Sequence, residues 1–244
     1  YELGFNGILA DDMGLGKTLQ VIALLDQLQT DKPSLVVCPS SLIYNWEDEV
    51  HKFSQTLPVT CIVSDANTRK TMIHAICGKH LYVTSYDYIR RDIELYDAIE
   101  FEYVILDESQ YIKNQKTKNA TSVKQLHALH KLALSGTPIE NSLAELWSVF
   151  DFLMPQYLYN YHYFQKKFET DIVKNQDQKK IQQLQKMVSP FILRRNKKDV
   201  LLELPDKIEK TQLIPFTQQE SELYFANLAQ INTQLQEIFQ MEKV

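Results

Sequence analysis

The stretch Gly7-Ile8-Leu9-Ala10-Asp11-Asp12-Met13-Gly14-Leu15-Gly16-Lys17-Thr18 decides the fold of this chain. It predicts a short apolar strand, a loop with two glycines, and a helix that begins at Lys-Thr. Backbone N–H groups of such a loop, together with the helix N-terminus, form a cradle for phosphate oxygens. The lysine reaches the β- and γ-phosphates, and the threonine hydroxyl suits Mg²⁺. The sequence therefore predicts a nucleotide site.

One position departs from the general phosphate-loop pattern, because Asp11 stands where that pattern has its first glycine. The alternative is a structural turn that binds no nucleotide. The agreement of strand, loop and helix favours the nucleotide site. Its predicted nucleotide-binding residues are Asp12, Met13, Gly14, Leu15, Gly16, Lys17, Thr18 and Leu19.

The composition excludes several classes of protein. The 244 residues carry a net charge of −5, and 44% of them are hydrophobic, which suffices for one large core. There is no apolar run of transmembrane length and no secretory signal. Three cysteines in no metal pattern indicate reduced thiols in a cytosolic or nuclear compartment. The chain starts at Tyr1, and we expect it to be a piece of a longer protein.

Short apolar strands alternate with helices up to about residue 138. Strands are expected at 34–38, 59–63, 81–84, 103–106 and 132–134; helices are expected at 18–30, from caps at Ser40 and Ser41 to 53, from a cap at Asp65 to 77, and at 121–129. This alternation predicts an α/β fold with a doubly wound, mainly parallel sheet. Ligands of such sheets bind beyond the carboxyl ends of the strands.

The pattern changes after Pro138. An apolar stripe at helical spacing over 143–153, followed by a segment rich in Tyr, Gln and Lys, predicts a helical appendage. One more strand is expected at 208–216, and a long helix is expected from Thr217 or Gln218 to 241.

Asp107 and Glu108 follow a strand whose carboxyl end should lie at the same rim as the phosphate loop. Asp107 is suited to hold Mg²⁺ opposite Thr18, and Glu108 to orient or deprotonate an attacking water. A solvated turn is the alternative. Ser135 and Thr137 end another strand at this rim. A Cys/His metal site and a Ser-His-Asp triad lack the further residues they require.

Several motifs now resemble one family. Residues 7–20 resemble motif I of the Swi/Snf-type ATPases of helicase superfamily two, in which an aspartate at the Asp11 position is usual. Later motifs follow in order: 38–42 with Asn45, Trp46 and Glu49 resembles motif Ia, 84–86 motif Ib, 107–110 with 112–114 motif II, 134–141 motif III, and 191–205 the segment between the two lobes.

The resemblance implies a first RecA-like lobe at 1–138, a helical protrusion at 139–190, an inter-lobe linker at 191–207 and a truncated start of lobe two at 208–244. It implies ATP and Mg²⁺ as cofactors. The implied catalytic residues are Lys17, Asp107, Glu108 and Gln110, the metal ligands Thr18 and Asp107, and the coupling residues of motif III Ser135, Gly136 and Thr137. Gln110 replaces the more usual histidine, and we expect activity to survive this.

The resemblance also implies a DNA-dependent ATPase that moves along double-stranded DNA and remodels DNA-bound protein complexes, with no membrane partner. The residues implied to face the DNA backbone are Ser40, Ser41, Thr84, Ser85, Lys113 and Asn114. The upstream adenine-contacting motif and the arginine finger of lobe two are absent, so this piece alone should be nearly inactive. The open alternatives are a nucleotide-sensing scaffold module and a strand-separating helicase. We expect a cytoplasmic protein of a bacterium rather than a nuclear protein of a eukaryote.

Overall fold

The computed structural model describes all residues except 1–3, 5, 137–141, 201–209, 211 and 242–244, and it describes only the backbone of 232–241. The chain divides into two compact units, Tyr1–Leu202 and Glu203–Val244, which we describe separately. The predicted domain boundaries at 138, 190 and 207 stay predictions. Of these three boundaries, the last lies nearest the division between the two units.

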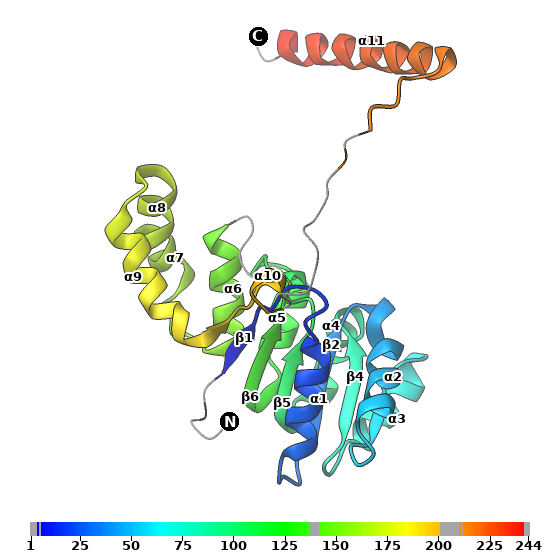
Figure 1. The fold of residues 1–244 in the computed structure, drawn as a ribbon, viewed down its shortest axis with the longest axis vertical. Helices are drawn as coiled ribbons and strands as arrows, with labels where there is room; N and C mark the ends of the chain where they lie inside the picture. Colours follow the sequence, from blue (N-terminus) through cyan, green and yellow to red (C-terminus); the bar gives the residue numbers. More distant parts are fainter. Residues whose placement is uncertain (1–3, 5, 137–141, 201–209, 211, 242–244) are drawn as a thin grey trace. The chain divides into compact units, whose positions relative to one another are not determined.

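The first unit is built on a seven-stranded sheet with the order β3-β4-β2-β5-β6-β1-β7 (Figure 1). Every strand pair among the described residues is parallel. The strands are β1 (Gly7–Leu9), β2 (Ser34–Cys38), β3 (Val59–Cys61), β4 (Leu81–Ser85), β5 (Glu100–Leu106), β6 (His127–Leu134) and β7 (Ile192–Leu193). The predicted α/β class with a parallel sheet is confirmed.

Helices cover both faces of this sheet because its central strands are apolar on both faces. On β2, Val36 and Cys38 pack with α1 (Lys17–Gln27) and α2 (Ile43–Phe53). Leu35 and Val37 face the opposite core, which contains residues of α3 (Ala66–His74), α4 (Tyr86–Asp92), α5 (Lys118–Lys124) and α6 (Leu143–Leu153). Short 3₁₀ turns follow three strands or helices, namely η1 (Ser40–Leu42), η2 (Ile93–Tyr96) and η3 (Ser109–Ile112).

The predicted appendage is helical. It contains α7 (Tyr161–Phe164), the π-helical segment η4 (Gln165–Glu169), α8 (Thr170–Asn175) and α9 (Gln178–Val188), and η5 (Ser189–Phe191) returns the chain to β7. Figure 1 shows these helices beyond α6, at the end of the strand order that is away from α2 and α3. Phe164 and Phe168 are fully buried in the core cluster that also contains α6, so the appendage is packed on the sheet domain.

Two local predictions in the first unit were wrong. Ser40 and Ser41 form η1 and cap no helix, since α2 follows Leu42 without a side-chain cap. The helix expected at 121–129 ends at Lys124, because residues from His127 onward pair with β5 starting at Glu100. The polar residues of this strand interrupt the alternation of apolar and polar residues that is typical of a strand. Its backbone hydrogen bonds to β5 outweighed the local helix propensity.

In the second unit, α11 (Gln218–Met241) confirms the predicted long helix. The Thr217 hydroxyl accepts a bond from the Glu220 amide at 3.3 Å, and the Glu220 carboxylate accepts one from the Thr217 amide at 2.9 Å, forming a capping box. The strand expected at 208–216 is wrong for the described residues 210 and 212–216, which form no strand. A strand requires a pairing partner, and the described residues offer none here.

Phe150 on α6 tests the attachment of the appendage, because its fully buried ring contacts Tyr157 and Phe191 at centroid distances of 6.2 Å and 6.3 Å. We expect Phe150→Ala to lower the free energy of unfolding by about 3–5 kcal/mol in urea titrations. Val173→Ala, at a side chain that is 66% exposed on α8, should change it by less than about 0.5 kcal/mol. Equal effects of the two substitutions would contradict this packing.

Candidate active site

The parallel sheet brings the sequence-predicted site residues to one rim. β1 leads into the phosphate loop, β2 into Ser40, β5 into Asp107, and β6 into Ser135. The ladders continue past the strand ends, since the Asp107 amide donates to the Val37 carbonyl at 2.9 Å and the Ser135 amide to the Leu9 carbonyl at 3.2 Å. Backbone hydrogen bonds therefore fix the positions of Asp107 and Ser135 at the rim.

Gly14 and Gly16 hold the phosphate loop in shape, with φ of +85° and +74°, values in the left-handed region that favours glycine. Gly16 directly precedes α1, so the loop runs into a helix N-terminus. The Lys17 ammonium lies against this loop, where Nζ donates to the Asp11 carbonyl at 2.7 Å. Leu19 is 41% exposed beside the loop and is not part of the core.

A cavity of about 320 Å³ joins the two halves of the predicted site. It is lined by Met13, Gly14, Gly16, Lys17, Thr18, Leu42, Asn45, Trp46, Glu49, Asp107 and Glu108. The lysine and threonine of the loop and both acidic residues after β5 thus face one space. Leu42, Asn45 and Glu49 also line it, and sequence reasoning had assigned them no role in nucleotide binding.

Asp107 is held by neutral donors. Trp46 Nε1 donates to its Oδ2 at 2.8 Å, and the Glu108 amide donates to its Oδ1 at 2.9 Å. Burial raises the pKa of the Asp107 carboxyl above its usual value, and the charge of Glu108 raises it further, whereas the hydrogen bond from Trp46 and the charge of Lys17 act in the opposite direction. Ionised Asp107 in this place therefore favours a nearby cation.

Glu108 adopts a left-handed backbone conformation, with φ of 50° and ψ of 56°, which is uncommon for a residue with a side chain. Its carboxylate accepts a hydrogen bond from Gln110 Nε2 at 2.7 Å, and the buried Gln110 Oε1 has no hydrogen-bond partner among the described residues. Gln110 therefore orients Glu108 and has one acceptor left over.

The other predicted residues differ in accessibility. Ser40, Ser41, Lys113 and Asn114 are exposed. Thr84 and Ser85 are buried, with their hydroxyls bonded to the Ile62 carbonyl at 3.0 Å and the Tyr88 amide at 3.2 Å. Each of these hydroxyls thus has a partner within the fold, and the DNA contact expected of the two residues stays a prediction.

The motif III residues are only partly described. Ser135 is buried, and a side chain at Gly136 would meet Met13 Cγ of the phosphate loop at 3.2 Å. Thr137 lies outside the described residues. β6 thus ends close to the phosphate loop.

Asp11, the position that departs from the general loop pattern, is fully buried and paired with Arg195. Arg195 Nε donates to both of its carboxylate oxygens, at 3.0 Å and 3.1 Å. The hydrogen bonds from Arg195 hold the pKa of Asp11 below its usual value, despite burial. Sequence reasoning missed this partner. The available signal was a carboxylate in a buried turn, which requires a cation.

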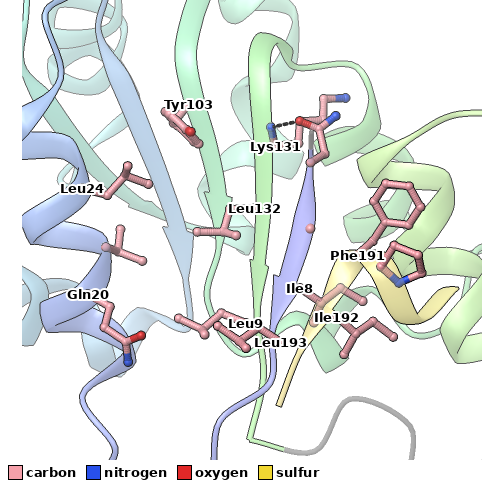
Figure 2. A pocket seen from close by; sticks show the side chains of 14 residues that line it. Ile8, Leu9, Gln20, Leu24, Tyr103, Lys131, Leu132, Phe191, Ile192 and Leu193 are labelled. Atoms are coloured by element: carbon pink, nitrogen blue, oxygen red, sulfur yellow. Dashed lines mark hydrogen bonds between the residues drawn. The ribbon is translucent and has the colours of Figure 1, made fainter. Parts of the chain in front are cut away.

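A larger cavity of about 550 Å³ lies between α1 and the strands β6, β1 and β7 (Figure 2). It is lined mainly by apolar side chains, among them Leu9, Leu24, Leu132 and Leu193, and contains none of the acidic residues of the rim. The smaller cavity is therefore the candidate active site.

A family model described as SNF2-related domain matches residues 2–243. The chain belongs to this SNF2-related family. The SWI2/SNF2 ATPase core of Sulfolobus solfataricus, solved in complex with dsDNA, matches with a TM-score of 0.75 and 37% identity over 97% of this chain and 50% of that chain. This match confirms the RecA-like fold.

Similar curated proteins of the SNF2-related family are much longer. The putative ATP-dependent helicase/translocase YwqA of Bacillus subtilis is 39% identical over 91% of this chain and 25% of its own length. The TATA-binding protein-associated factor MOT1 of Saccharomyces cerevisiae is 38% identical over 90% of this chain and 13% of its own length. The chain thus spans a quarter or less of both relatives. Because they come from a bacterium and a eukaryote, the comparisons do not support the expected bacterial source.

The hydrogen bond from Trp46 to Asp107 predicts a pH-dependent stability. Trp46→Phe removes a donor to a buried carboxylate and should cost about 1–3 kcal/mol of unfolding free energy at pH 7. The donor stabilises the charged form, so this part of the cost should shrink as the pH falls through the raised pKa of Asp107. Urea titrations at pH 7 and at mildly acidic pH measure the change.

Trp147→Phe is the matched control, because Trp147 is also buried and Nε1 donates to the uncharged Tyr159 carbonyl at 3.1 Å. Its cost should not vary over the same pH range. A Trp46→Phe cost that is equally constant would contradict the pairing with an ionised Asp107.

Proposed function

We propose that this chain forms the ATP-binding half of the motor of a DNA-dependent ATPase, which moves along double-stranded DNA and remodels protein complexes bound to it. The observation that supports this most is the shared cavity of Lys17, Thr18, Asp107 and Glu108. Two similar proteins point the same way, the putative ATP-dependent helicase/translocase YwqA and the SWI2/SNF2 ATPase core in complex with dsDNA.

Each residue has a defined role in this proposal. Lys17 and the N–H groups of the loop bind the β- and γ-phosphates of ATP. Thr18 and Asp107 would hold Mg²⁺, since their oxygen atoms suit a hard cation, and the bound ion would offset the negative charge of the phosphates. Glu108 accepts a proton from the attacking water, and Gln110 keeps its carboxylate oriented.

DNA binding is proposed at the exposed residues of the same rim, Ser40, Ser41, Lys113 and Asn114. Hydroxyl, amide and ammonium groups of this kind bind phosphates without reading the sequence.

Within the described part of the chain, no helix is both long and apolar enough to cross a membrane.

Glu108→Gln tests the catalytic assignment in the complete protein. We expect DNA-stimulated ATP hydrolysis to fall by at least about 100-fold, the lower end for loss of a general base, while binding of a labelled ATP analogue persists. Glu94→Gln, at an exposed carboxylate of η2 outside the cavity, should leave both unchanged. Hydrolysis that DNA does not stimulate would contradict the motor and favour a nucleotide-sensing module. Strand displacement would instead favour a helicase.

Lys113→Gln tests the DNA contact. If Lys113 binds one phosphate, its loss should weaken duplex binding for every sequence and reduce the slope of log affinity against log salt by about 0.9. Fluorescence anisotropy over a salt series measures this slope. Lys52→Gln, at the far end of α2, removes an equal charge and should leave the slope unchanged. Equal slopes for the native protein and both variants would show that Lys113 does not contact DNA.

A further inference from the structure

The buried carboxylate of Asp11 is bound by a residue 184 positions later in the chain. The Arg195 amide and Nε each donate to Asp11 Oδ1 at 3.0 Å, and Nη2 donates to Oδ2. Gln20 of α1 completes a ring of side chains, since its Nε2 donates to Asp11 Oδ2 at 3.2 Å and its Oε1 accepts from Arg195 Nη2 at 2.6 Å. The phosphate loop, α1 and the distant segment around Arg195 are thus joined by one hydrogen-bond network.

Backbone bonds extend this contact along the phosphate loop. The Ala10 amide donates to the Leu193 carbonyl at 2.7 Å, and the Asp12 amide donates to the Arg195 carbonyl at 3.1 Å. The Lys197 amide donates to the Asp12 carboxylate at 2.9 Å. The segment 192–197 therefore forms an outer wall of the loop.

Hydrophobic burial holds only the start of segment 192–197, where Ile192 packs against the core, because residues 193–197 are exposed. β7 has two residues, and Leu193 is 53% exposed. Figure 2 shows Leu193 beside Leu9 at the end of β1, with Gln20 close to the same end. The ladder with β1 holds residues 192 and 193, whereas the exposed residues 194–197 are held by the hydrogen bonds of Arg195 and Lys197 to Asp11 and Asp12.

We infer that Arg195 is a positioning residue that couples nucleotide binding at the phosphate loop to the seating of segment 192–197. The inference rests on the proposed nucleotide site. Lys17 Nζ now donates to the Asp11 carbonyl, and phosphates compete for that ammonium. Lys17 bonds the main-chain carbonyl of Asp11, whereas Arg195 bonds its carboxylate, so turning Lys17 to the phosphates leaves the contact between Arg195 and Asp11 in place. Loop and segment then order together, and linkage makes the effect reciprocal.

This coupling has a consequence for the rest of the chain. Segment 192–197 precedes the second compact unit, Glu203–Val244, with few residues between them. The state of the nucleotide site is thereby conveyed to the chain that leads into that unit.

Hydrogen exchange of the full chain, with and without a non-hydrolysable ATP analogue and Mg²⁺, tests the coupling. In the native chain the analogue should slow exchange of the Asp12, Arg195 and Lys197 amides. Arg195→Gln should abolish this protection over 192–197 and weaken analogue binding by about 5- to 150-fold, the usual range of coupling between sites. Exchange of β5 serves as the check that the variant is folded.

Arg194→Gln is the matched control, since it removes the same charge from an exposed neighbour that makes no hydrogen bond or ion pair among the described residues. It should behave like the native chain. In an Asp11→Asn background, Arg195→Gln should have a much smaller effect on binding than alone, because Arg195 acts through Asp11.

Two failures are distinguishable. If the native chain binds the analogue and Arg195→Gln binds it equally, with equal protection over 192–197, the coupling is refuted and the nucleotide site stands. If the native chain does not bind the analogue, or if Lys17→Ala binds it as tightly as the native chain, the proposed nucleotide site is refuted, and the coupling with it.

Discussion

Parallel pairing of β1 with β6, and of β6 with β5, is the constraint on which the rest of the structure depends. It places the carboxyl ends of these strands at one rim, so a loop near residue 14 and an acidic pair near residue 107 meet without any direct bond between them. The ladders continue beyond the strands through the amides of Asp107 and Ser135. The cavity is therefore bounded by rigid backbone.

The buried Asp11 and the half-buried Asp107 at this rim have different hydrogen-bond partners and opposite pKa shifts. Asp11 has a guanidinium beside it, which lowers its pKa, and it serves the structure of the loop. Asp107 has the neutral donor Trp46, and burial raises its pKa. Asp11 is already paired with a cation, whereas the ionised Asp107 would be stabilised by one. Asp107 is also the carboxylate that shares a cavity with Thr18. Their different partners separate a structural acid from a candidate metal ligand.

Much of the fold was predictable because its signals are local. The apolar runs of β2 and β4, the cap at Asp65 and the capping box at Thr217 are decided by neighbouring residues. The errors occurred where distant partners decide. The first residues of β6 look helical or polar by themselves, and only their bonds to β5 make them a strand. Distant partners also decide the surroundings of Thr84, whose hydroxyl donates to the Ile62 carbonyl, a bond that no local pattern indicates.

The sequence by itself determined that a glycine loop joins a strand to a helix with Lys17 and Thr18 at its start, because backbone conformation and helix geometry act over a few residues. It also determined which acidic pair ends a strand. Only the tertiary structure decided that Arg195 balances Asp11, that Trp46 holds Asp107, and that α2 supplies a wall of the cavity. These contacts join residues 61 to 184 positions apart, and no local pattern encodes which distant side chain will supply a missing charge or donor.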